Sequence, residues 1–138
     1  MLPRMECTRM NHEEELIKAF FVPTKRERYL EIVSRPKKRE KFLRELGHFK
    51  ALDPRYVVTI PTNKRHATDI ALILAHKGAP KSCWVTSEDS RIDGQNLPLD
   101  EALHMIVGYG MGTFLWCIAG KLAYFEDEEV RWILERRS

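Results

Sequence analysis

Hydrophobic residues in the first third of the chain recur at intervals of three and four, the spacing that places side chains on one face of a helix. Asn11 is a favourable N-cap residue, and glutamates follow it in the first turn. The helical stretches are 11–21, 24–34 and 37–47, and they are interrupted or ended by Pro23, Pro36 and Gly47. This pattern predicts a helical segment over residues 11–50, preceded by a flexible tail at residues 1–10.

The hydrophobic pattern changes in the middle of the chain. Residues 55–61 are largely β-branched and apolar without alternation, as expected for a strand that is buried on both faces. A helical stretch at 62–78 follows, with Thr62 or Asn63 as its cap, and residues 82–88 form a second strand-like segment. A strand, a helix and a strand in so short a span predict a right-handed crossover that joins two parallel, neighbouring strands.

Three further strand-like segments end the chain, after a short helix at 99–107. The segments are 113–118, 121–126 and 130–135. The links between them are so short that successive strands must run antiparallel, which predicts a meander. Alternation along the first of these strands places Phe114, Trp116 and Ile118 on one side of the sheet.

The elements together predict an α/β protein with α+β character. A helical segment at 11–50 precedes an α/β sheet segment at 51–138, whose mixed sheet has about five strands, one βαβ crossover and a C-terminal antiparallel meander. A chain of 138 residues has the size of one domain, so residues 1–138 are expected to form a single domain.

The composition is typical of a soluble globular protein, with 43% hydrophobic and 31% charged residues. No apolar run approaches the ~20 residues that a membrane helix needs, and the N-terminal residues lack the apolar core of a signal peptide. Cys7, Cys83 and Cys117 are too few and too widely spaced for a disulfide framework. These features favour a cytoplasmic protein that spans no membrane.

Charge is divided unevenly along the chain. Residues 1–65 contain 16 Lys and Arg against 9 Asp and Glu, whereas residues 66–138 contain 7 against 11. Such an asymmetry suits a nucleic-acid or acidic partner, and it equally suits two halves that neutralise each other when they pack.

The basic residues are concentrated in the helices at 24–46, where aromatic residues are sparse. Phosphate backbones are bound mainly by such charge. The candidate nucleic-acid ligands are Lys37, Lys38, Arg39, Lys41 and Arg44. Interleaved glutamates favour a second interpretation, a solvated helical face on which Glu40 pairs with Arg44 and Lys41 pairs with Glu45.

Polar residues follow each strand of the predicted crossover. Ligands tend to lie beyond the carboxyl ends of parallel strands, so segments 61–66 and 86–93 are expected to border one pocket that binds an anion. The candidate ligand-binding residues are Thr62, Asn63, Lys64, Arg65, His66, Glu88, Asp89, Arg91 and Asp93. The carboxylate spacing differs from that of a calcium-binding loop, so neither a metal nor a cofactor is expected. The other interpretation is that both segments are ordinary polar loops.

Three glycines alternate in the stretch GYGMGTF at residues 108–114. A dinucleotide-binding glycine loop follows a strand and opens a helix, whereas here a helix precedes and a strand follows. The stretch therefore predicts a turn from helix into sheet, with Gly108 ending the helix. Alternate glycines also leave one side of the segment bare, and the ring of Trp84 or Trp132 is expected to pack there.

The residues form no recognisable catalytic constellation, because the histidines lack metal-binding spacings and no nucleophile motif is present. Three classes of function remain. The first is a binding or partner-interaction domain, whose partner is another protein or an anionic polymer. The second is a nucleic-acid-binding protein that uses the basic helices at 24–46. The third is a small enzyme or ligand-binding domain with an anion site between 61–66 and 86–93. The sequence does not define an oligomeric state.

Overall fold

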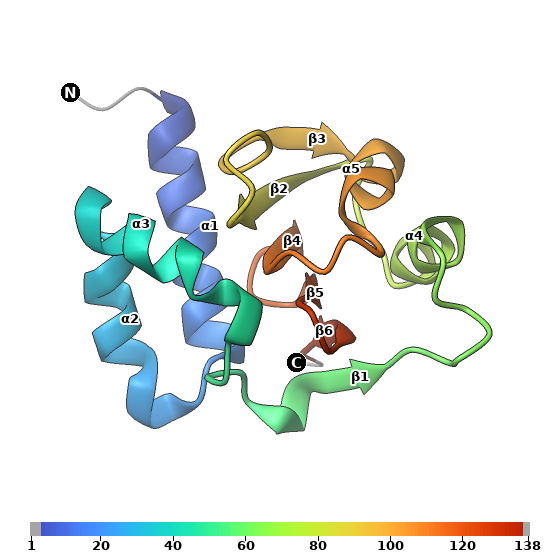
Figure 1. Cartoon of the computed structure of the whole chain (residues 1–138), viewed down its shortest axis with the longest axis horizontal. Coiled ribbons are helices and arrows are strands. Elements are labelled where there is room, and N and C mark those ends of the chain that lie inside the picture. The colour runs from blue at the N-terminus through green and yellow to red at the C-terminus, as the bar shows by residue number, and fades with distance from the viewer. Residues whose placement is uncertain (1–3, 137–138) are drawn as a thin grey trace.

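The computed structural model describes the backbone of residues 4–136 and the side chains of residues 12–136. Figure 1 shows a sheet that lies between two groups of helices. The helices are α1 (Arg4–Phe20), α2 (Arg26–Val33), α3 (Pro36–Arg44), α4 (Ala67–His76) and α5 (Leu99–Ile106). The strands are β1 (Val57–Thr59), β2 (Ser82–Ser87), β3 (Asn96–Pro98), β4 (Thr113–Ile118), β5 (Leu122–Glu126) and β6 (Arg131–Glu135). Short 3₁₀ turns occur at Pro23–Lys25, Leu46–His48 and Pro54–Tyr56.

All neighbouring strands of the sheet pair antiparallel, in the order β1-β6-β5-β4-β2-β3. The predicted C-terminal meander of β4, β5 and β6 is confirmed. The prediction of a mixed sheet with parallel neighbours is wrong. β1 and β2 run in the same direction, but the meander lies between them, and each pairs with one of its outer strands. Antiparallel ladders are slightly more stable per residue than parallel ones, so the edges of β4 and β6 are the better partners.

The sheet has six strands, one more than the hydrophobic pattern indicates. The additional strand is β3, which pairs with the outer edge of β2. Its residues fall in a stretch whose polarity and turn residues are typical of a loop. An edge position suits Pro98, because a proline has no amide to donate to a further strand.

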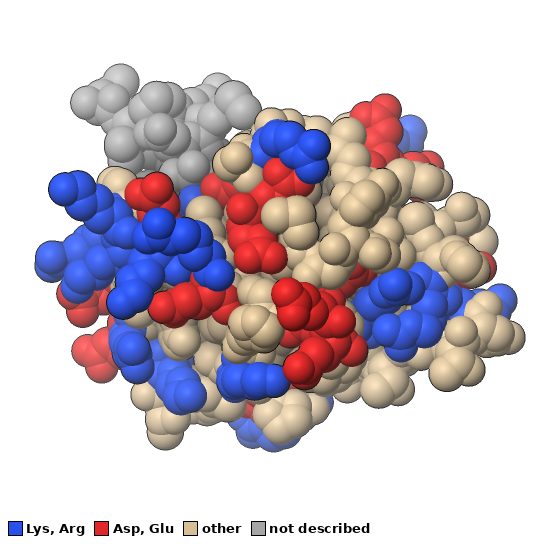
Figure 2. Space-filling view, in the orientation of Figure 1, with Lys and Arg blue, Asp and Glu red and all other residues tan. Residues whose placement is uncertain are grey.

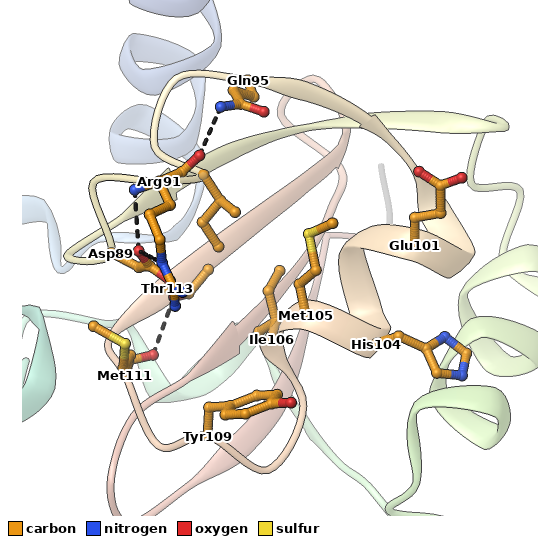
Figure 3. A pocket seen from close by; sticks show the side chains of 11 residues that line it. Asp89, Arg91, Gln95, Glu101, His104, Met105, Ile106, Tyr109, Met111 and Thr113 are labelled. Atoms are coloured by element: carbon orange, nitrogen blue, oxygen red, sulfur yellow. Dashed lines mark hydrogen bonds and ion pairs between the residues drawn. The ribbon is translucent and has the colours of Figure 1, made fainter.

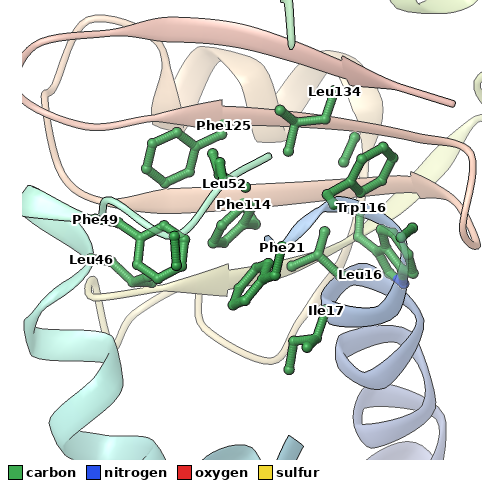
Figure 4. Close-up of a cluster of buried hydrophobic side chains, with 14 of the residues drawn as sticks. Leu16, Ile17, Phe21, Leu46, Phe49, Leu52, Phe114, Trp116, Phe125 and Leu134 are labelled. Atoms are coloured by element: carbon green, nitrogen blue, oxygen red, sulfur yellow. The ribbon is translucent and has the colours of Figure 1, made fainter. Parts of the chain in front are cut away.

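The sheet buries a hydrophobic cluster on each of its faces. On the face covered by α1, α2 and α3, the rings of Phe21, Phe49, Phe114 and Phe125 form a network of contacts with centroid distances of 4.7 to 6.2 Å (Figure 4). The other face is covered by α4 and α5, and its cluster includes Leu74, Leu103, Leu115 and Tyr124. Adjacent residues of β4 and β5 therefore enter opposite clusters, as alternation along a strand requires.

Alternation along β4 ends before its last residue. Phe114 and Trp116 share one side of the strand, as predicted, and this side faces α1. Ile118, predicted on the same side, packs on the opposite side with the α4 and α5 cluster. The pairing of β4 with β5 shifts register between Trp116 and Ile118. A bulge of this kind adds a residue to one strand and turns the next side chain to the other face.

The helical N-terminal segment is confirmed, with one difference at its start. α1 begins at Arg4 rather than at Asn11, so residues 4–10 of the predicted tail are the first turns of this helix. Residues 1–3 lie outside the described residues. None of the helices in the described chain combines the length and the apolarity needed to cross a membrane.

Candidate functional site

The glycine segment at 108–112 holds a carboxylate of the chain itself. The amides of Gly108 and Gly110 each donate to Oε2 of Glu126 at 3.0 Å, and the hydroxyl of Tyr124 donates to Oε1 at 2.8 Å. Arg131 places its Nε 3.5 Å from the same carboxylate, which is buried. Burial and the neighbouring carboxylate of Glu126 both raise the pKa of the Tyr124 hydroxyl, so it acts as a donor here. The segment thus does bind an anion, although an internal one.

The bare side of the glycine segment receives a main chain rather than an aromatic ring. A Cβ placed on Gly112 would lie 2.3 Å from the carbonyl carbon of Leu46, which is closer than any real contact. The predicted packing of Trp84 or Trp132 onto these glycines is therefore wrong. The amide of Gly112 donates to Oε1 of Glu88 at 2.7 Å, so all three glycine amides face carboxylates.

The structure does not bring the two predicted ligand-binding segments together. β1 and β2 end at the same end of the sheet, but three strands separate them, a distance of roughly 19 Å at about 4.8 Å per spacing. α4 begins at Ala67, with His66 and not Thr62 or Asn63 at the N-cap position. Thr62, Asn63, Lys64 and His66 are exposed, and the half-buried Arg65 accepts a hydrogen bond at its carbonyl from Arg131.

The charged residues of segment 86–93 are engaged within the protein. Asp89 forms a 3.0 Å ion pair with Arg91. The hydrogen bonds from the Arg91 side chain lower the pKa of the Asp89 carboxyl. Glu88 binds the Gly112 amide, and Asp93 accepts from the Ser87 amide and from Arg39. Among residues 12–136, no three His, Cys, Asp or Glu side chains are grouped in a way that could hold a metal ion.

Arg39, a predicted phosphate ligand, is buried between two carboxylates. Its guanidinium forms two hydrogen bonds with Glu13 of α1 and two with Asp93, and Thr86 donates a further one to Glu13. Burial alone would lower the pKa of Arg39, but the hydrogen bonds to Glu13 and Asp93 raise it above its ordinary value. Arg39 therefore ties α3 to α1 and to the 88–95 loop, and it is not available to nucleic acid. The other candidates, Lys37, Lys38, Lys41 and Arg44, are exposed on α3.

Two adjoining clefts flank α5, which together with α4 covers the face of the sheet opposite α1, α2 and α3. The first has a volume of about 630 Å³ and is bordered by the 88–95 loop, α5 and the glycine segment (Figure 3). Ile92 and Ile106 contribute apolar lining, and Asp89, Arg91 and Glu101 are polar residues of its wall. The second cleft, of about 750 Å³, lies between α4 and α5, and His104 lines both clefts.

The exposed large apolar side chains of the described residues all line these clefts. Tyr109 is 70% exposed, Leu72 58%, Met105 47% and Met111 36%. Tyr109, Met105 and Met111 line the first cleft, whereas Leu72 lines the second. We call the surface formed by Leu72, His104, Met105, Tyr109 and Met111 the α5 surface.

Reasoning from the sequence did not identify the α5 surface. The signal that could have found it is the alternation in GYGMG, because the amides of the glycines turn inward to Glu126 and Glu88. The residues between them, Tyr109 and Met111, consequently face outward. In this stretch, Tyr109 and Met111 are therefore better candidates for contact with a partner than the glycines on either side of them.

Comparison of the chain with protein families, with curated proteins and with solved structures found no match.

Proposed function

We propose that this protein is a binding domain that holds a partner protein at the α5 surface. The observation that carries the proposal is the gathering of Leu72, Met105, Tyr109 and Met111 around two adjoining clefts. Elsewhere on the described residues, large apolar side chains are buried or partly buried. Contiguous exposed apolar residues with a polar rim are typical of protein–protein interaction sites.

The types of residue at the α5 surface support a protein partner. Tyr and Met are enriched at interfaces, Tyr because it combines a large apolar ring with a polar tip and Met because it adapts to irregular surfaces. Tyr109 stands at the outer edge with most of its side chain in solvent, where it can enter a pocket of the partner. A small ligand would be held mainly by the buried residues of the lining, Ile92 and Ile106, whereas the exposed part of Tyr109 suits a larger partner.

The ion pair of Asp89 with Arg91 and the carboxylate of Glu101 form a polar rim beside the apolar residues. Such a rim orients a partner without supplying most of the binding energy. We therefore expect the partner to present apolar side chains at its centre and polar groups around them.

A site-specific photo-cross-link tests the proposal. A photoreactive phenylalanine derivative placed at position 109 in the source cell should yield a discrete cross-linked product with a partner protein. The matched control places it at position 121, where the exposed Lys121 lies between β4 and β5 at the other end of the sheet. A further variant combines the photoreactive residue at position 109 with Met105→Lys. This substitution should abolish the cross-linked product.

The stability of the variants separates binding from folding. Met105→Lys should change the free energy of unfolding by less than about 0.5 kcal/mol, because the side chain is half exposed. Ile106→Ala, one residue along α5, removes a buried side chain and should cost about 2–5 kcal/mol. Equal products from positions 109 and 121, or a product that survives Met105→Lys, would rule out the α5 surface as the binding site.

A further inference from the structure

Exposed basic side chains gather on α2 and α3, on the face of the sheet opposite the α5 surface. Figure 2 shows Lys and Arg clustered on the left of the molecule, where Figure 1 places these two helices. We define the basic face as the exposed residues Arg28, Arg35, Lys37, Lys38, Lys41 and Arg44. Because α1, α2 and α3 cover one side of the sheet and α4 and α5 the other, this face is separate from the surface of the proposed function.

The ion pairs that would neutralise the basic face are largely missing. Glu31 pairs with Lys38 at 3.2 Å and with Arg35 at 3.7 Å, so one carboxylate serves two cations. The pairs of Glu40 with Arg44 and of Lys41 with Glu45, expected for a solvated face, are not among the ion pairs of residues 12–136. Arg39 and Lys38 of α3 are paired within the protein, whereas Lys37, Lys41 and Arg44 take part in none of the ion pairs of residues 12–136. The charges of these three residues are available to an external anion.

The two helices also form a groove that arranges these charges. It has a volume of about 380 Å³, and Arg28 of α2 lines it together with Lys38 and Lys41 of α3. Two carboxylates, Glu31 of α2 and Glu45 after α3, also lie in the lining, so the groove carries one more positive than negative charge. Tyr29 and Phe42 lie in its lining, where they are half-buried and buried. Cations from two helices thus border one groove, and Lys37 and Arg44 extend the positive charge along α3 beyond it, as contact with successive phosphates requires.

The lining rings are already used inside the protein. The Tyr29 ring makes an edge contact with Phe21 at 5.1 Å and a tilted contact with Phe42 at 5.6 Å. Rings held in this way do not stack on exposed bases, so recognition would depend on the charged backbone and not on base identity.

The observations favour nucleic acid over a membrane. A peripheral membrane surface combines basic residues with exposed apolar side chains that enter the bilayer. The four exposed large apolar residues of the described chain all lie on the α5 surface, away from α2 and α3. We infer that the basic face binds the phosphodiester backbone of nucleic acid, with Arg28, Lys38 and Lys41 in the groove and Lys37 and Arg44 beside it.

Fluorescence anisotropy with labelled oligonucleotides of about 20 residues tests this inference, using single-stranded RNA and duplex DNA over a range of salt concentrations. If about four phosphates are contacted, the logarithm of the association constant should fall with the logarithm of salt with a slope of about −3 for the single strand and about −4 for the duplex. The difference between the two probes shows which form of the backbone fits the groove.

A matched pair of double variants identifies the surface. Lys38→Ala with Lys41→Ala should weaken binding at low salt at least about tenfold and make the slope shallower by about 1.5. The control, Lys64→Ala with Lys121→Ala, removes the same charge from exposed positions outside the basic face and should retain most of the affinity. Thermal unfolding of both proteins checks that the exposed substitutions leave the fold intact.

Three results would overturn the inference: no binding at low salt, equal losses in the two double variants, or polyglutamate or anionic vesicles binding as tightly as nucleic acid with the same dependence on Lys38 and Lys41. Each of these outcomes leaves the cross-linking test at position 109 unaffected, because that test concerns the other face of the sheet.

Discussion

The main-chain amide of Gly110 donates a 3.0 Å hydrogen bond to Oε2 of Glu126, a carboxylate buried inside the protein. The amide of Gly108 donates to the same oxygen, so the turn between α5 and β4 is built around this carboxylate. The φ angle is 91° at Gly108 and 71° at Gly110. Residues other than glycine adopt such positive φ angles only with strain. The glycine segment thus uses the geometry of an anion-binding loop for the stability of the fold.

Replacing the central carboxylate tests this arrangement. Glu126→Gln keeps the shape of the side chain but removes its charge. It also places the side-chain NH2 group opposite the Gly108 and Gly110 amides or the Tyr124 hydroxyl, which are themselves donors. We expect a loss of about 1–3 kcal/mol in the free energy of unfolding, measured with urea. Glu128→Gln, at a side chain that is 63% exposed, is the control and should have little effect. Similar losses in the two variants would mean that the Gly108 and Gly110 amides do not depend on Glu126.

The close approach of Gly112 to Leu46 allows a second prediction. Gly112→Ala would force a methyl group into the main chain of Leu46, so the segment must move. We expect a loss of about 3 kcal/mol in stability or a failure to fold. Gly47→Ala is the matched control, because its Cβ would meet Glu88 Oε1 at an ordinary 3.6 Å. If Gly112→Ala unfolds at the same denaturant concentration as Gly47→Ala, the two segments are not packed as described.

The buried guanidinium of Arg39 should be essential for stability. Arg39→Met retains much of the apolar stem but leaves the carboxylates of Glu13 and Asp93 buried without their partner. The expected loss is about 3–5 kcal/mol. Arg35→Met, at an Arg side chain that is 63% exposed, should stay within about 0.5 kcal/mol of the wild type. Stability comparable to that of Arg35→Met would show that Arg39 is solvated.

His12 should make stability depend on pH near neutrality. Its ring lies against Trp84 and Trp116, at centroid distances of 5.5 and 5.7 Å, and burial lowers its pKa below the ordinary 6.5. The unfolded chain therefore takes up a proton at a higher pH than the folded chain. The contribution of the neutral ring is complete above pH 6.5 and is lost as the pH falls through the lower, folded pKa.

Substitution of His12 isolates this contribution. His12→Phe keeps an aromatic ring against the two tryptophans and cannot be protonated. Urea midpoints measured from about pH 7 to about pH 5 should fall more steeply for the wild type than for His12→Phe. Parallel pH profiles for the two proteins would contradict the assignment.

Local patterns in the sequence were sufficient for most helices and strands. The stripe in residues 24–34 corresponds to α2, and the alternating segment 130–135 corresponds to β6. Periodicity reports which side of an element is apolar, and that property depends on near neighbours in the chain. Short links likewise determine that β4, β5 and β6 pair antiparallel, because so few residues cannot cross the sheet.

The pairing of β1 and β2 could not be predicted in the same way. A helix between two strands favours a crossover, and the two strands do point in the same direction. Whether they become neighbours depends on a competition with the edges of β4 and β6, and those strands come 50 residues or more after β1 in the chain. The candidate pocket between 61–66 and 86–93 depended on that adjacency.

By itself, the sequence determined the helical front segment, the strands of the meander and the position of the glycine turn, since these follow from interactions between residues close in the chain. Only the tertiary structure decided that Lys38 is exposed while the adjacent Arg39 is buried, because Arg39 meets Glu13 and Asp93 across 26 and 54 positions of the chain. It also decided that the amides of GYGMG bind Glu126 and Glu88, which leaves Tyr109 and Met111 to the surface. Contacts between distant residues arise from packing and hydrogen bonding in the folded chain, and no local pattern encodes them.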